Sequence, residues 1–318
     1  MRSRLSPRRA LGQGVIDVLT APLMLIAIAI VTLLVALPFA AVVHQQLQES
    51  LSVQPHVNLA DTEIDPEWWM EFREHARGLS ATFTPAVLGF AATLDGLGGI
   101  LDGRGIPLAL LAPLIVSIVT WALLWGGVLQ RFQQGRGLGV GGFLRTGAAH
   151  AAAFIAIAVA AAVINLLLFL TVHKLLFGPV HGWLVAMTST ERDAFLIRVV
   201  LYALFFSLVA AVSLVADYAR VAAVAGRLTS PVRMIRAAVA FLSRHTAAAV
   251  TMYLMTGAVF VLVTIAYGTL EIYGGSQVGG WRAVAIGQAY VLVRLAIRLT
   301  FAASELRLFN ANHTAVAE

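Results

Sequence analysis

Six long apolar runs constrain the fold of this sequence more than any other feature. They lie at about residues 18–43, 107–129, 150–176, 194–217, 247–269 and 283–303. Each is long enough to cross the hydrocarbon core of a bilayer as an α-helix, which takes about 20 residues. An α-helix also satisfies its own backbone hydrogen bonds, as hydrocarbon requires. The runs therefore predict an all-α, polytopic integral membrane protein with about six transmembrane helices.

The composition agrees with a membrane location. Of the 318 residues, 59% are hydrophobic and 12% are charged, whereas a soluble domain carries about 25% charged residues. The basic segment before the first run resembles the start of a secretory signal. The run itself exceeds the roughly 7–15 apolar residues of a signal core. We therefore expect it to be retained as the first transmembrane helix.

Charge in the connecting segments predicts the orientation. Segments 130–149 and 218–246 contain arginines and no acidic residue, while segment 44–106 holds nine acidic residues and three arginines. Cytoplasmic loops of membrane proteins are enriched in Lys and Arg. We therefore expect both termini to lie in the cytoplasm. Residues 1–318 form a single transmembrane domain in this interpretation, with an extracytoplasmic helical insertion at 44–106.

The insertion is expected to contain helices of its own. Asp65 followed by Pro66 is a strong helix start, because Asp caps the first turn and Pro fits the first helical position. We expect this helix to continue to about Leu79. Trp68 and Trp69 are predicted interfacial anchors, since tryptophan is enriched at headgroup level. The apolar stretch 83–101 contains Asp95 and several glycines, so it is predicted to be an interfacial or re-entrant helix rather than a seventh span.

The second basic loop is predicted to contain an amphipathic helix that begins at Pro231. Arginines occupy one face and apolar side chains the other, as in helices that lie in the membrane interface. The arginines are candidate contacts for anionic lipid headgroups of the inner leaflet: Arg233, Arg236 and Arg244.

Charged residues inside the predicted spans are the main candidates for a site. Arg294 and Arg298 are four residues apart and so share a helix face. Arginine in a membrane needs a partner, and the candidates are Asp217 and Glu305. The four residues form either a site for an anion or an ion-pair clasp that only stabilises the fold. The sequence leaves both interpretations open.

Signatures of catalysis and of cofactor binding are weak. The sequence has no cysteine, which excludes thiolate metal sites and cysteine nucleophiles. The glycine pattern at 137–142 follows a membrane helix, whereas a dinucleotide-binding loop follows a strand. The eight histidines are scattered. We therefore expect no catalytic residues, no metal, no cofactor and no nucleic-acid partner, and we expect membrane lipids as partners.

Several stretches carry a resemblance to known proteins. They are Trp125–Phe132, Gly141–Arg145, Asp217–Val221, Pro231–His245 and Ala289–Arg298. Together they resemble a family of uncharacterised bacterial six-helix inner-membrane proteins. That family is distantly similar to the membrane domain fused to some bacterial glycerophosphodiesterases. The resemblance implies a fold and a location in the bacterial cytoplasmic (inner) membrane, and it implies no activity. Phosphodiesterase chemistry is not carried over, because this sequence holds no such catalytic domain.

Three functions follow as alternatives. The first is a non-enzymatic inner-membrane protein for envelope organisation, or a subunit of a membrane assembly, with protein partners or a homo-oligomer. The second is a transporter or binding protein for a small or lipidic anion that uses the arginines of the inner half. The third, an intramembrane lipid-modifying enzyme, lacks an identifiable nucleophile, base or metal.

The predicted orientation can be tested with reporter fusions. Reporters fused after residues 140 and 235 are expected to be cytoplasmic, and a reporter near residue 60 extracytoplasmic, because the arginine-rich loops stay inside. Paired alkaline phosphatase and fluorescent protein fusions measure this directly. An extracytoplasmic reading at residue 140 would contradict the orientation.

Overall fold

The computed structural model describes residues 5–53, 65–83, 98–99, 107–135, 137–274 and 281–313. All regular structure within these ranges is helical. Six helical segments are long and apolar enough to cross a membrane: Pro22–Ser52, Leu108–Gln134, Gly139–Ala186, Glu191–Ala225, Pro231–Leu270 and Val284–Asn312. The prediction of an all-α, multi-pass membrane protein is thereby confirmed.

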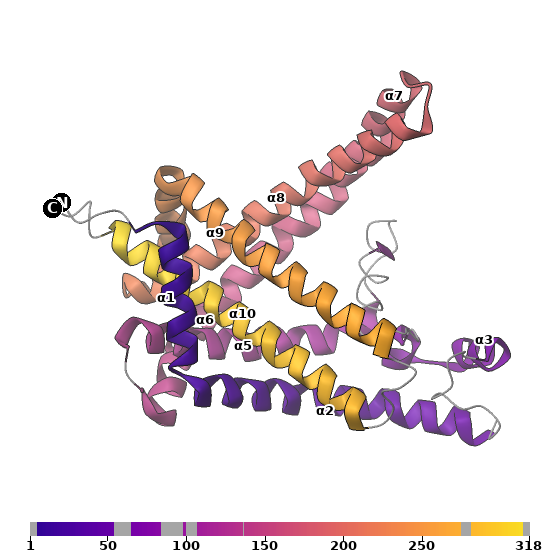
Figure 1. Cartoon of the computed structure of the whole chain (residues 1–318), viewed down its shortest axis with the longest axis horizontal. Helices are drawn as coiled ribbons and strands as arrows, with labels where there is room; N and C mark the ends of the chain where they lie inside the picture. The colour runs from indigo at the N-terminus through magenta and orange to yellow at the C-terminus, as the bar shows by residue number, and fades with distance from the viewer. Residues whose placement is uncertain are drawn as a thin grey trace. The chain divides into compact units, whose positions relative to one another are not determined.

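The helices follow one another along the chain (Figure 1). The α-helices are α1 (Pro7–Leu19), α2 (Pro22–Val53), α3 (Pro66–His75), α5 (Leu111–Gln134), α6 (Gly139–Leu167), α7 (His181–Ala186), α8 (Glu191–Ala225), α9 (Pro231–Gly274) and α10 (Trp281–His313). The shorter helical elements are η1 (Gly78–Thr82), η2 (Leu108–Leu110), η3 (Leu168–His173) and η4 (Leu176–Val180).

The chain divides into two compact units. Unit 1 comprises Met1–Asp17, Trp121–Tyr253 and Phe301–Glu318, and unit 2 comprises Val18–Thr120 and Leu254–Thr300. Several long helices contribute residues to both units. The candidate sites below each lie within one unit.

The helical segments are longer than the apolar runs that predicted them. The third spans 48 residues, from Gly139 to Ala186, a contour length of about 70 Å at 1.5 Å per residue. The hydrocarbon core is only about 30 Å thick. This segment pairs with α8 as a helical hairpin whose tip lies at α7 (Figure 1). A hydropathy pattern identifies only the apolar part of a helix. The helix itself extends further, because its backbone hydrogen bonds and its contacts with the neighbouring helix α8 stabilise the additional turns.

The end of this hairpin contains two π-helical elements that the sequence did not indicate. They are η3 and η4, and η4 includes Pro179. Proline has no N–H to donate and its ring crowds the preceding turn, which disturbs the regular α-helical ladder. An aromatic cluster packs η3 and η4 against α8, with ring centroids 4.9 Å apart for Phe169–Phe205 and 4.3 Å for Phe177–Tyr202.

Helix α9 combines the predicted amphipathic helix and the fifth span. It begins at Pro231, as predicted, and His245 interrupts it with φ −130° and ψ 25°. On the segment before this kink, Met234, Ala238 and Phe241 are buried. The arginines of the same segment are exposed. The kink therefore separates an arginine-bearing amphipathic segment from the apolar span.

In unit 2, helix α3 begins where the sequence predicted. The Asp65 carboxylate accepts hydrogen bonds from the backbone N–H groups of Glu67 and Trp68. The helix ends at His75 rather than near Leu79, because Ala76 is extended and Gly78 has φ +57°. Residues 84–97 and 100–106 lie outside the described residues, so the interfacial or re-entrant helix remains a prediction.

Helices α5 and α6 approach each other closely in unit 1 through glycines. A Cβ placed on Gly126 would lie 2.9 Å from the Cα of Gly147, and one on Gly147 would overlap the carbonyl oxygen of Leu123. Small residues at such crossings let backbones of membrane helices pack without intervening side chains. The contact fixes the crossing point of the two helices.

Substitution of Gly147 tests this contact. Gly147→Ala is expected to destabilise the protein by about 2 kcal/mol or more, because the added methyl meets backbone atoms that cannot move aside. Gly141→Ala on the same helix is the control, because nothing lies within 4 Å of its Cβ position. That control should be neutral or slightly stabilising. Thermal unfolding in detergent measures both, and equal melting temperatures for the two variants would contradict the close contact.

Candidate functional site

The charges near the C-terminal end of α8 include an ion pair within one helix. Asp217 and Arg220 are three residues apart, and the Arg220 guanidinium contacts the Asp217 carboxylate. Their side chains are 27% and 18% exposed, respectively. Sequence reasoning identified Asp217 as a site residue and did not name Arg220 as its partner. The pairing of Asp217 with Arg294 and Arg298 remains a prediction.

Glu305 lies beside this ion pair, in the last part of α10. Glu305 is 2% exposed, and it interacts electrostatically with Asp217 and Arg220. Tyr218 of α8 is fully buried and interacts electrostatically with Glu305. Glu305 Oε1 and the Tyr218 hydroxyl are both buried without a hydrogen-bond partner. We call Asp217, Tyr218, Arg220 and Glu305 the polar cluster.

Aromatic side chains surround the polar cluster within unit 1. Tyr218 stacks on Phe241 of α9 with ring centroids 5.0 Å apart, and Phe241 lies 4.9 Å from Phe309 of α10. These contacts bring α8, α9 and α10 together at one level. They also leave the buried oxygen atoms in apolar surroundings, where an unsatisfied polar group costs about 1–3 kcal/mol.

Arg294 lies in unit 2 and contacts aromatic rings. Its guanidinium carbon is 5.5 Å from the ring centroid of Tyr290 and 5.9 Å from that of Phe260. Tyr290 is itself stacked on Tyr267, with centroids 4.1 Å apart. A guanidinium within about 6 Å of an aromatic face is stabilised by the ring quadrupole. Arg298, one turn further along α10, is exposed.

A second ion pair in unit 1 connects residues far apart in the sequence. The Arg307 guanidinium donates two hydrogen bonds of 2.8 Å to the two carboxylate oxygens of Asp17. The pair joins α1 to α10 across 290 positions. Sequence reasoning missed it. Asp17 is the only acidic residue before Glu49, and this isolated acidic residue in a basic segment was the one sequence feature that could have indicated an ion pair.

An apolar groove lies beside the polar cluster in unit 1. It has a volume of about 260 Å³ and is lined by α6, α8 and α9. Ile235 of α9 forms one wall of the groove. The other lining residues, on α6 and α8, are four small alanines and four larger aliphatic residues: Ala160, Ala161, Ala211 and Ala216, and Ile157, Ile164, Val212 and Val215. Ala216 immediately precedes Asp217, and Ile235 immediately precedes Arg236. The groove therefore ends at the level of charged residues.

The candidate lipid contacts are close to this groove in the sequence of α9. Arg233 and Arg236 flank Ile235, and both are exposed, as is Arg244 two turns further on. The helix presents guanidinium groups on its surface while Ile235 contributes to the apolar wall. The exposed guanidinium groups and this part of the apolar wall therefore belong to one short segment of α9.

The two tryptophans of α3 have different environments. Trp68 is fully buried and donates a hydrogen bond of 3.0 Å from Nε1 to the Ser50 hydroxyl of α2. Trp68 therefore packs inside unit 2 and holds α3 against α2. The interfacial role of the two tryptophans remains a prediction. Trp69 is half-buried and contacts Phe72 and Phe83.

Within the described ranges, no three histidine, aspartate or glutamate side chains come together to hold a metal ion. No protein-family model, no curated protein and no solved structure matches the chain.

Substitution of Glu305 tests whether the polar cluster reduces stability. Glu305→Met is expected to raise the stability by about 1–3 kcal/mol, because an apolar side chain of similar length replaces a buried polar group whose Oε1 has no hydrogen-bond partner. The comparison is Arg307→Met, two residues away, which removes the ion pair with Asp17 and should lower the melting temperature. Differential scanning fluorimetry in detergent distinguishes the two. A lower melting temperature for Glu305→Met would show that Glu305 stabilises the fold.

Proposed function

We propose that this chain is a non-enzymatic protein of the bacterial cytoplasmic membrane that binds an anionic phospholipid at unit 1 and contributes to envelope organisation. Both termini lie in the cytoplasm in this proposal. It combines the expected role in envelope organisation with the expected recognition of a lipidic anion. The relationship to the six-helix inner-membrane family remains part of the proposal.

One observation carries the proposal. An apolar groove of about 260 Å³ is lined by Ile235, and exposed arginines flank that residue on the same helix. A phospholipid with one acyl chain in the groove would bring its phosphate to the level of Arg233 and Arg236.

The two parts of the site contribute differently to binding. Lipid tails are as apolar as leucine, so an acyl chain gains packing rather than hydrophobic burial when it enters the groove. The arginines supply the selectivity, since each basic residue near an anionic membrane surface contributes about 1 kcal/mol. An anionic headgroup should therefore be preferred over a zwitterionic headgroup with the same tails.

A membrane assembly is the second candidate, and the exposure of the spans favours it. The share of buried residues in the most apolar part of each span ranges from 6% in the first to 22% in the fourth. Such surfaces contact lipid and are also available to partner proteins or to further copies of this chain. Cross-linking in native membranes would distinguish stable partners from lipid alone.

The lipid proposal predicts a selective loss of binding. The purified full chain in detergent is expected to bind phosphatidylglycerol more tightly than phosphatidylcholine, as measured by native mass spectrometry. The double variant Arg233→Ala/Arg236→Ala should weaken phosphatidylglycerol binding by about tenfold or more, because two contacts of about 1 kcal/mol each are lost.

The groove has its own matched pair of variants. Ala160→Leu should fill the groove and lower binding of both lipids, whereas Ala162→Leu, an exposed position of the same helix outside the groove, should not. Equal binding of the two lipids by the wild type would contradict the role of the arginines. Equal behaviour of the two leucine variants would contradict the role of the groove.

A further inference from the structure

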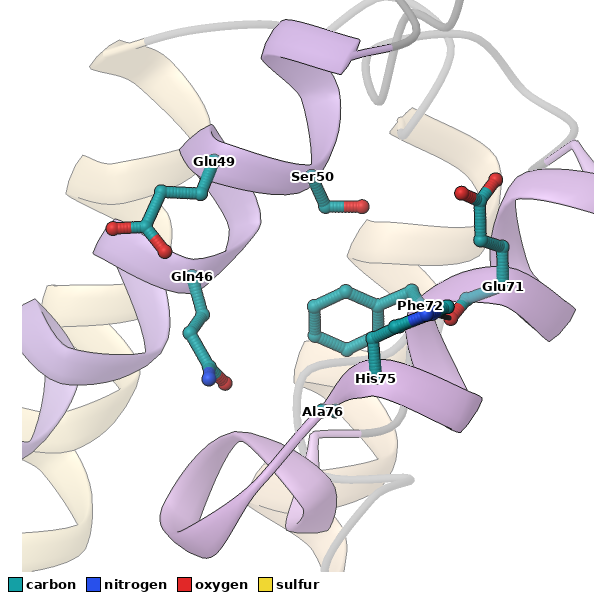
Figure 2. A pocket seen from close by; sticks show the side chains of 7 residues that line it. All are labelled: Gln46, Glu49, Ser50, Glu71, Phe72, His75 and Ala76. Carbon is teal, nitrogen blue, oxygen red and sulfur yellow. Dashed lines mark hydrogen bonds between the residues drawn. The ribbon is translucent and has the colours of Figure 1, made fainter.

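A second cavity lies in unit 2, where the end of α2 meets α3. It has a volume of about 260 Å³, and Figure 2 shows the side chains that line it. They are Gln46, Glu49 and Ser50 of α2, with Glu71, Phe72 and His75 of α3, and Ala76 after it. Unlike the groove of unit 1, this cavity has polar walls, so it suits a different kind of ligand.

The cavity walls are held in place by packing between the two helices. Trp68 is fully buried and bonds to Ser50, and Phe72 stacks on Trp68 with ring centroids 5.5 Å apart. The Phe72 ring lies between the polar side chains of the two helices (Figure 2). The Asp65 side chain caps the N-terminus of α3, about one turn before Trp68, and so fixes where the helix begins. A site built on two packed helices is already formed before a ligand arrives.

The polar atoms that line the cavity are mostly acceptors. Gln46 Oε1 is buried and has no hydrogen-bond partner. The Glu49 carboxylate accepts one hydrogen bond, from Gln45, and the Glu71 carboxylate lies on the opposite helix (Figure 2). His75 Nδ1 lies 2.9 Å from the Glu71 carbonyl oxygen. Since a carbonyl only accepts, Nδ1 donates, and Nε2 of the neutral ring is a further acceptor.

Acceptors, carboxylates and an aromatic ring together select a donor that carries a positive charge. A metal ion does not fit, because the described residues hold no group of three or more histidine, aspartate or glutamate ligands. The volume is below the roughly 300–1,000 Å³ typical of sites for drug-sized ligands, so the ligand is small. An ammonium group donates to carboxylates and is also attracted to an aromatic face.

We infer that this cavity binds a small organic ammonium ion, with the charged nitrogen held by Glu71, Glu49 and the buried oxygen of Gln46 and the carbon chain against Phe72. The inference is independent of lipid binding at unit 1. A negative result in one site therefore leaves the other proposal unaffected.

The test uses the purified full chain in detergent and butylammonium as the probe. Isothermal titration calorimetry should show saturable binding of butylammonium and none of 1-butanol, which has the same carbon chain without the charge. Glu71→Gln should weaken binding by about tenfold, the effect of losing one charge-assisted hydrogen bond. Glu74→Gln is the control, because it removes the same charge from an exposed position of α3 that does not line the cavity.

Glu49→Gln provides a second variant on the other wall in case Glu71→Gln does not fold. It should also weaken binding, since Glu49 lines the cavity from α2. Three results would overturn the inference. They are no saturable binding by the wild type, equal binding of 1-butanol, or equal weakening by the cavity variants and Glu74→Gln, which would indicate attraction to surface charge alone.

Discussion

Hydrocarbon offers no hydrogen-bond partners, and this constraint governs the placement of polar side chains along the spans. Thr32, Ser213 and Thr264 donate to carbonyl oxygens four residues earlier in their own helices. Each hydroxyl is thereby satisfied without a second helix. A small number of buried oxygens depart from this rule, among them Glu305 Oε1, the Tyr218 hydroxyl and Asn165 Oδ1. Leaving such atoms unpaired in apolar surroundings costs stability.

Two of these exceptions, Tyr218 and Glu305, lie near the arginine-bearing segment of α9 in unit 1. Phe241, on the buried face of that segment, stacks on Tyr218 and also contacts Phe309 of α10. The groove ends at Ala216, next to the ion pair of Asp217 with Arg220. A lipid bound in the groove would therefore reach a level of the membrane where the protein concentrates its charges.

Local signals predicted the fold well, whereas they did not indicate the contacts between residues far apart in the sequence. The six spans, the Asp65 cap and the start of α9 at Pro231 each depend on a short stretch of sequence, and the structure confirms them. The pairing of Asp17 with Arg307 depends on residues 290 positions apart, and no local pattern encodes it. The burial of Trp68 likewise follows from the docking of α3 on α2. The tryptophan pair alone predicted only a membrane interface.

The small residues of unit 1 show why sequence alone cannot separate packing from binding. Gly126 and Gly147 allow two backbones to touch, so that even a methyl group is excluded. Ala160 and Ala211 are also small, yet they face a groove that no side chain of the described residues fills. The difference lies in what stands opposite, a backbone in the first case and open space in the second. Small residues between membrane helices therefore produce either a tight crossing or a lipid-accessible groove, and only the arrangement of α5, α6 and α8 decides which.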